Sequence, residues 1–376
     1  MRQRLQQLLR CPACASALDT TPFVESSDGE VVDGLLVCSC GLSYPVVDTI
    51  PRMLSDAWEL FPEFVERYRN RLGRPARTDG TSPTKISRVS ERTRQSFGYQ
   101  WTTFSAMVCD FRENFWNYLA PATPEFFRGR LGLDAGCGFG RHIYHAASSG
   151  AEMVGVDFSQ AIDATRQNTK HLPNVHLVQA DIYRLPFARE TFDFIYSIGV
   201  LHHLPDPGRG LRSLSSLLKV DGTLFVWLYS SKRKILNAML ETARRVTTWM
   251  PHRLVQALSW LGAVIDWVGF VLPYRALRSV PGFKALCERW TPARVKLYSR
   301  YPFQVLYADW FDRLAAPVRF YYDEQGVRAL TRAAGLSGVE VTPTGLYGWR
   351  ACGVKEADGS AAAEKGRNKQ EYHFAA

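Results

Sequence analysis

The chain has 376 residues, of which 46% are hydrophobic and 22% are charged. This ordinary globular composition excludes wholesale disorder, and the length suggests two domains or one large domain with additions. The net charge of +10 is concentrated in residues 67–94 and 232–300. A protein that coats nucleic acid would be basic along its whole length, so the charge distribution argues against that class.

Four of the eight cysteines lie within the first forty residues, as the pairs Cys11 and Cys14, Cys38 and Cys40. Two close pairs of thiolates suit one tetrahedral structural zinc, and reduced cysteines without metal are the alternative. The stretch CGLSYPVVDTIPRM that begins at Cys40 resembles the small zinc-ribbon activator proteins of tRNA and release-factor methyltransferases. The resemblance implies a small β-rich, zinc-ribbon-like domain over residues 1–56, although the second pair is spaced C-x-C where those proteins have C-x-x-C.

Residues 67–96 are rich in Arg, Ser, Thr, Gly and Pro, which predicts a basic linker over residues 57–95. Beyond it, short β-like runs alternate with helical segments of about ten residues, a pattern typical of a parallel α/β sheet. We expect a doubly wound, mostly parallel, seven-stranded Rossmann-like sheet formed by residues 96–229 and 311–355. Residues 230–310 break the alternation and are predicted to form a helical cap, and residues 356–376 a disordered tail.

The most specific motif is LGLDAGCGFGR, which begins at Leu131. It follows a predicted strand, opens a predicted helix, and precedes Asp157, which ends the next predicted strand 21 residues after Gly136. Gly136 and Gly138 allow a tight turn and close approach of a ligand, the helix N-terminus offers N–H groups to an anion, and the carboxylate can bind ribose hydroxyls. A glycine-rich turn that binds nothing is the alternative.

Two further stretches follow the glycine motif, ADIYRLPF from Ala180 and FDFIYSIGVLHHLPDP from Phe192. Together the motifs resemble class I S-adenosylmethionine-dependent methyltransferases of the type 11 branch, over about residues 96–229 and 320–355. The resemblance implies methyl transfer, with S-adenosylmethionine as cofactor. The contacts that it implies are Asp134, Gly136, Gly138 and Arg141 for the methionine end, Asp157 for the ribose, Phe158, Asp181 and Ile182 for the adenine, and Ser197 and Ile198 for the sulfonium methyl.

The block SFGYQW at residues 96–101 resembles the N-terminal lid of part of this superfamily. The resemblance implies that Tyr99 and Trp101 close over the cofactor, and ordinary core packing is the alternative.

His202 and His203 follow the fourth predicted strand of the sheet, where open α/β sheets bind their ligands. An imidazole with a pKa of about 6.5 suits removal of a proton near neutrality, so either histidine, and His203 in preference, is a candidate base. The alternative is that both only shape the pocket. Asp206 is expected to cap the next helix.

Residues 254–274 form a long apolar run with Asp266 near its centre, which argues against a transmembrane span. The aromatic and cationic residues of the insertion predict a cap over the methyl-acceptor pocket, and a cap that only completes the core is the alternative. Basic amphipathic helices also bind anionic membranes, so residues 250–280 are a candidate for peripheral membrane contact. The expected acceptor is a small molecule, bulky and amphipathic or lipid-like.

Two other functions fit parts of the pattern. An RNA methyltransferase could use the zinc ribbon and the basic linker, but the stretch that begins at Ser197 lacks an Asn/Asp-Pro-Pro-Tyr motif, which argues against base amino groups as acceptors. A non-catalytic cofactor-binding partner of another enzyme is the third hypothesis. Residues 1–10 do not resemble a signal peptide, so a cytoplasmic location, peripheral at most to a membrane, is expected.

Overall fold

The computed structural model describes residues 1–72, 88–345 and 348–357. Residues 73–87 of the predicted basic linker and nearly all of the predicted tail lie outside the described residues. Residues 57–72, which we expected to belong to the linker, instead form three short helices, α2 (Ala57–Leu60), α3 (Pro62–Arg67) and α4 (Arg69–Leu72).

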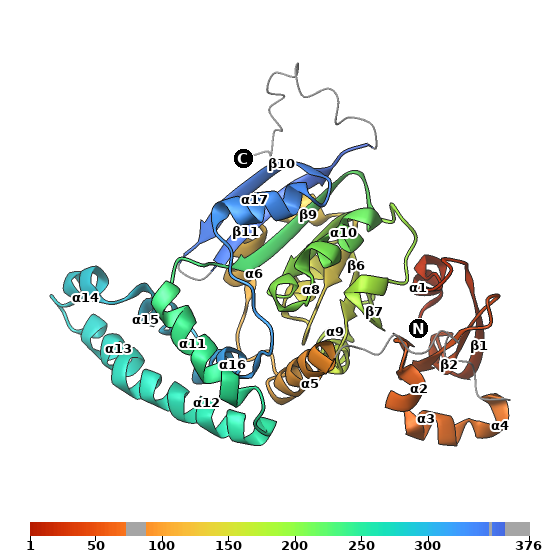
Figure 1. The fold of residues 1–376 in the computed structure, drawn as a ribbon, viewed down its shortest axis with the longest axis horizontal. Helices are drawn as coiled ribbons and strands as arrows, with labels where there is room; N and C mark the ends of the chain where they lie inside the picture. The colour runs from red at the N-terminus through yellow and green to blue at the C-terminus, as the bar shows by residue number, and fades with distance from the viewer. Residues whose placement is uncertain (73–87, 346–347, 358–376) are drawn as a thin grey trace, which may run out of the picture.

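An eleven-stranded sheet organises the chain, with the strand order β1-β2-β3-β4-β7-β6-β5-β8-β9-β11-β10 (Figure 1). Its last seven strands are the predicted Rossmann-like sheet, in which β5 to β9 run parallel. Strand β11 is antiparallel to both of its neighbours, β9 and β10, so β10 again runs in the direction of β5 to β9. The predicted α/β fold is therefore confirmed. These strands are β5 (Leu131–Ala135), β6 (Glu152–Asp157), β7 (Val175–Ala180), β8 (Phe192–Ile198), β9 (Leu218–Tyr229), β10 (Leu336–Thr344) and β11 (Gly348–Lys355).

Helices cover both faces of this sheet, because its central strands are apolar on both sides. Apolar side chains of α10 and α17 pack on one face, and those of α6, α7 and α8 pack on the other. Asp206 caps α10, as predicted, by accepting a hydrogen bond of 2.9 Å from the Arg209 N–H. The helices are α5 (Arg88–Thr103), α6 (Arg112–Leu119), α7 (Pro124–Phe127), α8 (Arg141–Ser148), α9 (Ala161–Thr169), α10 (Pro207–Leu217) and α17 (Glu324–Arg332).

The N-terminal residues extend the sheet rather than forming a detached unit. Strand β4 pairs in parallel with β7, with Arg52 opposite Gln179. The Arg52 side chain is only 2% exposed and donates hydrogen bonds to Gln179 and to Asp163 of α9. One apolar core therefore runs through both parts. The N-terminal elements are α1 (Gln3–Leu8), β1 (Leu18–Glu25), β2 (Val31–Cys38), β3 (Ser43–Val47) and β4 (Ile50–Met53).

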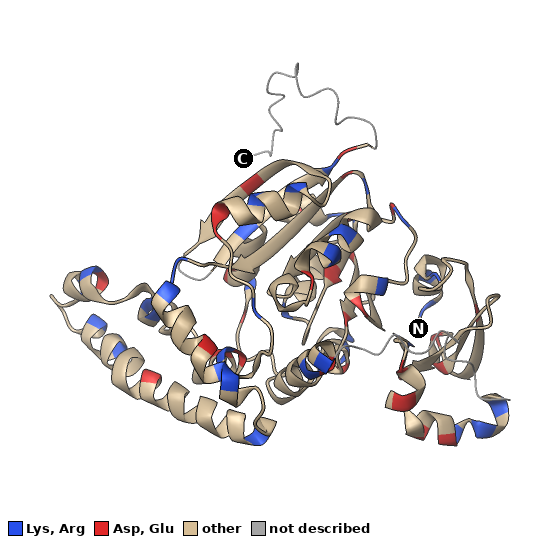
Figure 2. Cartoon of the chain, viewed as in Figure 1, with Lys and Arg blue, Asp and Glu red and all other residues tan. Residues whose placement is uncertain are grey.

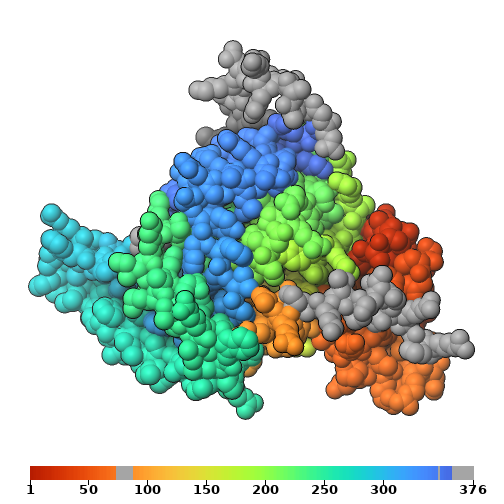
Figure 3. Space-filling model, viewed as in Figure 1, coloured from red at the N-terminus to blue at the C-terminus, as the bar shows by residue number. Residues whose placement is uncertain are grey.

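The segment after β9 is helical and lies on the side of the molecule opposite the N-terminal strands (Figures 1 and 3). The stretch His252–Ser279 is long and apolar enough to cross a membrane by length and composition, and an 18-residue window within it has a mean hydropathy of 1.6. Its elements are α11 (Lys234–Thr247), α12 (His252–Asp266), a π-helical turn η3 (Trp267–Val271), α13 (Leu272–Ser279), α14 (Lys284–Trp290), α15 (Ala293–Tyr298) and α16 (Phe303–Ala315).

Candidate active site

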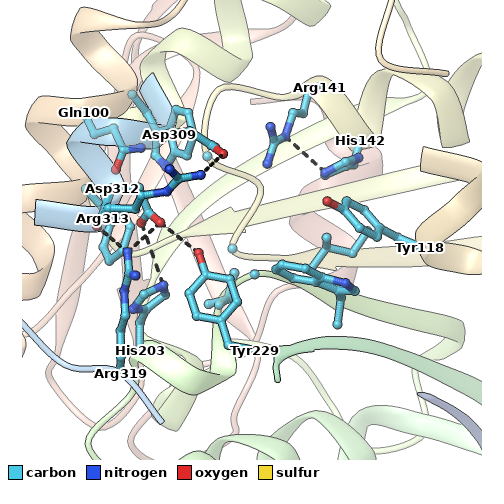
Figure 4. A pocket seen from close by; sticks show the side chains of 18 of the residues that line it. Gln100, Tyr118, Arg141, His142, His203, Tyr229, Asp309, Asp312, Arg313 and Arg319 are labelled. Carbon is cyan, nitrogen blue, oxygen red and sulfur yellow. Dashed lines mark hydrogen bonds and ion pairs between the residues drawn. The ribbon is translucent and has the colours of Figure 1, made fainter. Parts of the chain in front are cut away.

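A cavity of about 490 Å³ lies between the carboxyl ends of the parallel strands and the helices of residues 230–315. This volume is in the range of small-molecule and cofactor sites. One end of the wall is made by the glycine loop between β5 and α8. The other end is made by α11, α15 and α16, so the inserted helices form part of the same cavity (Figure 4).

The glycine loop takes a backbone conformation that side chains oppose. Gly136 and Gly138 have φ angles of +91° and +56°, and a Cβ atom on Gly136 would lie 2.3 Å from a methyl group of Val200. The positive φ favours glycine at both positions, and at Gly136 a side chain would also clash with Val200. The loop therefore brings bare backbone and the first N–H groups of α8 to the cavity.

Asp157, at the end of β6, holds this loop in place. Its carboxylate accepts hydrogen bonds from the Gly138 N–H at 2.9 Å, from the Ser159 N–H at 2.8 Å and from the Ser159 hydroxyl at 2.7 Å. Burial raises the pKa of Asp157 above its ordinary value, although these three donors oppose the shift. Two carboxylate oxygens offer about four acceptor positions, so capacity for a ligand hydroxyl remains.

The structure brings most of the predicted cofactor residues onto one wall. These are Trp101, Gly136, Gly138, Arg141, Asp157, Phe158, Asp181, Ile182 and Ile198. His203, the preferred candidate base, also lies on this wall. Four of the predicted residues lie off the wall that the described residues form, namely Asp134, Ser197, Tyr99 and His202.

Asp134 and Ser197 lie behind the glycine loop, where they support strands. Ser197 is fully buried, and its hydroxyl donates a hydrogen bond of 2.9 Å to the Ala135 carbonyl, which joins β8 to β5. Asp134 is 2% exposed, and burial raises its pKa to about 8. Neither side chain lies on the cavity wall that the described residues form, and their contact with the cofactor stays a prediction.

Tyr99 faces the inserted helices rather than the cavity. Its hydroxyl donates a hydrogen bond to Gln256, and its ring stacks on Phe311 with centroids 5.6 Å apart. The reason is helical periodicity, because residues 97 and 101 of α5 face the cavity while residue 99 lies on another side of the helix. Of the two predicted lid residues, Trp101 lies on the cavity wall, where its ring packs against that of Phe139 with centroids 5.1 Å apart.

His202 is buried beneath the cavity wall. Its ring packs on that of Tyr229 with centroids 3.9 Å apart and on that of His203 at 4.3 Å. Burial holds the pKa of His202 well below its ordinary value. These contacts give His202 a packing role and leave His203 as the candidate base.

His203 belongs to a polar cluster at the far end of the cavity (Figure 4). Asp312 of α16 accepts hydrogen bonds from Arg319 at 2.7 Å and from the Tyr229 hydroxyl at 2.8 Å. The His203 Nε2 atom lies 4.0 Å from the other oxygen of Asp312, and its Nδ1 atom lies 2.7 Å from the Val318 carbonyl oxygen. The turn after β8, the end of β9 and the segment that includes α16 and Arg319 therefore meet in this cluster, although they are distant in sequence.

The charges of this cluster are set by burial and by pairing. Burial, opposed by Asp312, lowers the pKa of His203 to about 4, so the imidazole is neutral near pH 7. Burial alone would raise the pKa of Asp312, but Arg319 and the neighbouring donors outweigh it and hold the pKa below its ordinary range. The cluster thus contains a neutral histidine beside an ionised carboxylate.

The sequence analysis did not identify Tyr229, Asp312 or Arg319. One signal existed: α16 is apolar except for a few polar residues, and Asp309, Asp312 and Arg313 recur at the i, i+3, i+4 spacing of one helix face. All three line the cavity. Arg319 lies beyond α16 in a segment without a recognisable motif, and nothing in the sequence distinguishes it.

The four N-terminal cysteines converge at a second site. Their sulfur atoms all lie within 4.8 Å of one another, with 3.8 Å between Cys11 and Cys40 and 3.4 Å between Cys14 and Cys38. A tetrahedral zinc ion with Zn–S bonds of about 2.3 Å would separate its sulfurs by roughly 3.8 Å. The four thiols therefore fit a zinc ion, and the short C-x-C spacing does not prevent them from meeting.

Residues 133–226 match the family described as "Methyltransferase domain". The match begins in β5 and ends in β9, so it includes the glycine loop, Asp157 and His203. Residues 133–226 therefore form a methyltransferase domain, and the strand order and the glycine loop agree with the class I resemblance found in the sequence.

Among curated relatives, a tRNA U34 carboxymethyltransferase of Pseudoalteromonas atlantica is 35% identical over 106 residues, which cover 27% of this chain and 32% of that protein. An uncharacterized protein of Synechococcus is 35% identical over 128 residues, or 31% of each chain. The chain thus spans about a third of the length of the curated relatives it matches.

Among solved structures, human N-acetylserotonin methyltransferase aligns with a TM-score of 0.44 at 13% identity, covering 72% of this chain and 60% of that one. An S-adenosylmethionine-dependent methyltransferase of Aquifex aeolicus aligns with a TM-score of 0.38 at 14% identity, covering 67% and 96%.

Proposed function

We propose that the protein transfers a methyl group from S-adenosylmethionine to a small amphipathic or lipid-like acceptor held beneath the inserted helices. The observation that carries this proposal is the continuity of the cavity, whose wall runs from the glycine loop to α11, α15 and α16. Leu236, Leu240 and Leu297 supply apolar surface at the inserted end. A cofactor and an acceptor can therefore share one enclosed space.

The residues of the glycine end fit the cofactor. Bare backbone at Gly136 and Gly138 admits close approach, and the N-terminus of α8 suits the carboxylate of the methionine end. Asp157 has acceptor capacity for the ribose hydroxyls, and Trp101 covers the loop. The bound cofactor would supply an electrophilic methyl group, and the cavity would hold the acceptor in line with it.

His203 is suited to take a proton from the acceptor. A carbonyl oxygen can only accept a hydrogen bond, so the short contact with Val318 places the imidazole proton on Nδ1. Nε2 is then left without a proton and can act as a base. Asp312, 4.0 Å away, would stabilise the positive charge that the ring acquires.

The test follows labelled methyl groups from the cofactor. The purified protein is incubated with cell extract and isotopically labelled S-adenosylmethionine, and the small-molecule, lipid and RNA fractions are analysed by mass spectrometry. Label in a small organic-soluble product supports the proposal. Label in tRNA would overturn the choice of acceptor, and cofactor binding without any labelled product would point to a non-catalytic partner. Asp157→Ala serves as the inactive control.

We also propose that Cys11, Cys14, Cys38 and Cys40 hold one structural zinc ion. The convergence of their four sulfur atoms supports this proposal. Cys38 is the last residue of β2, and Cys40 lies in the turn between β2 and β3, so a bound ion would tie the N-terminal strands together.

A further inference from the structure

The helical stretch from α12 to α13 exposes an apolar stripe, here called the cap stripe. It consists of Leu254, Leu258, Leu261, Ile265, Val268 and Leu272, each between 37% and 59% exposed. Their alternating spacings of four and three residues place them along one helix face. Every exposed residue from position 254 to position 272 is apolar, and the 28-residue stretch extends roughly 42 Å at about 1.5 Å per residue.

The opposite face of the same helix is fixed to the protein. Val255, Ser259 and Ala263 are buried, and α12 packs along α16. The Asp266 carboxylate points inward, where it accepts hydrogen bonds from Arg294 at 2.9 Å and from the Trp310 indole at 2.6 Å. The aspartate that argued against a membrane segment is therefore absent from the exposed face. A helix held this way can lie on a bilayer surface but is not free to cross it.

Positive charges flank the cap stripe. Arg253 precedes it, Arg275 and Arg278 follow it, and Lys284 and Arg289 lie on α14, all of them exposed. Figure 2 shows blue segments toward both ends of the long helix formed by α12 and α13, with one red segment between them. In the described helices from α12 to α14, the acidic residues are the inward Asp266 and Glu288, which pairs with Arg278. The surface thus combines an apolar centre with a cationic border.

We propose that the cap stripe docks on an anionic lipid bilayer, with the helix lying in the plane of the membrane. Apolar side chains would enter the boundary between headgroups and acyl chains, and the border cations would contact anionic headgroups. Exposed tryptophans nearby, Trp260 and Trp290, suit the same boundary. A second copy of the chain fits less well, because a symmetric interface across this helix would bring cations of the same sign together.

This inference deepens the proposed function, since it names a membrane as the place where the acceptor is met. Helix α11 presents Leu236 and Leu240 to the cavity, and it exposes Ile235 and Met239 to solvent at 81% and 64%. Helix α11 therefore forms a single layer between the cavity and its own exposed apolar side chains, while α12 packs on α16, which lines the cavity. Docking and methyl transfer are nevertheless measured separately, so either can fail alone.

The experiment measures flotation of the full chain with vesicles. Neutral vesicles contain phosphatidylcholine, and anionic vesicles contain added phosphatidylglycerol. The wild type is expected to float with anionic vesicles at low salt and to bind less at high salt. The triple variant Leu258→Gln/Leu261→Gln/Ile265→Gln should lose binding by at least about tenfold. Its matched control, Val24→Gln/Val108→Gln/Val220→Gln, removes exposed apolar groups elsewhere and should bind like the wild type.

A second pair of variants separates the charge from the apolar contribution. Lys284→Gln/Arg289→Gln should lower binding to anionic vesicles by about tenfold or more and leave binding to neutral vesicles unchanged. The control Lys170→Gln/Arg332→Gln should change neither. Cofactor affinity, measured on every variant, establishes that each one is folded and that the methyltransferase part is intact.

Three results would overturn docking. The wild type could remain in solution with anionic vesicles at low salt, or the glutamine triple variant could bind them as the wild type does. The third is self-association that depends on the cap stripe without vesicle binding, which would assign the surface to a second copy.

Discussion

The cofactor end of the cavity is built from neighbouring parts of the chain, whereas the acceptor end takes its side chains from distant segments. Gly136, Gly138 and Asp157 belong to one β-α-β unit, in which the glycines contribute backbone and Asp157 contributes its carboxylate. His203 and Asp312 come together only through the packing of α16 against the sheet end. The comparison shows that one cavity can have a locally encoded half and a half that depends on tertiary contacts.

The largest effect is expected at the acceptor end. Asp312→Ala would leave the buried Arg319 without its ion-pair partner, which should lower the free energy of unfolding by about 3–5 kcal/mol. Asp309→Ala is the matched control, because that side chain is half exposed and should cost about 1 kcal/mol or less. Urea denaturation measures both. Equal losses would show that the buried Asp312–Arg319 pair stabilises the acceptor end no more than the half-exposed Asp309 does.

A smaller effect is expected at the cofactor end. Asp157→Ala removes the acceptor that holds the Gly138 N–H and that would bind the ribose. Leaving such groups unpaired costs about 1–3 kcal/mol, so affinity for S-adenosylmethionine should fall roughly 5- to 150-fold by calorimetry. Asp110→Ala, at an exposed aspartate, should leave affinity unchanged. If Asp157→Ala binds the cofactor like the wild type, the site assignment is wrong.

A weaker effect distinguishes the two aromatic residues of α5. Trp101→Ala should weaken cofactor binding by about 0.5–1.5 kcal/mol, because its ring lies on the cavity wall. Tyr99→Phe loses its hydrogen bond to Gln256 and should leave cofactor affinity unchanged. The comparison is made by calorimetry. A loss of affinity in Tyr99→Phe comparable to that in Trp101→Ala would restore Tyr99 to the cofactor lid.

The smallest effect on the cavity is expected from the cysteine site. Metal analysis should find about one zinc per chain in the wild type and a much lower content in Cys14→Ser. The variant should unfold at a lower temperature while its cofactor affinity stays the same, because the four cysteines lie off the cavity wall that the described residues form. Wild-type protein with a zinc content far below one per chain would end the zinc proposal.

The fold and the glycine loop could be predicted from the sequence because their signals are local. Alternating β and helical runs specify a parallel sheet, and the glycines must stand where φ is positive. The same reasoning predicted that Ser197 and Asp134 contact the cofactor, because each residue lies near the carboxyl end of a strand that leads to the cavity. It could not resolve which side of the sheet end each side chain occupies.

The sequence by itself determined the class of the domain, the convergence of two cysteine pairs as a hypothesis, and an apolar helical insertion. The tertiary structure decided that β4 joins β7, that Tyr99 packs on the insertion, and that Asp312 and Arg319 meet His203. The physical reason is sequence separation. The geometry of a motif within one β-α-β unit follows from its local sequence, so it can be predicted. A contact between distant segments depends on how every intervening element packs.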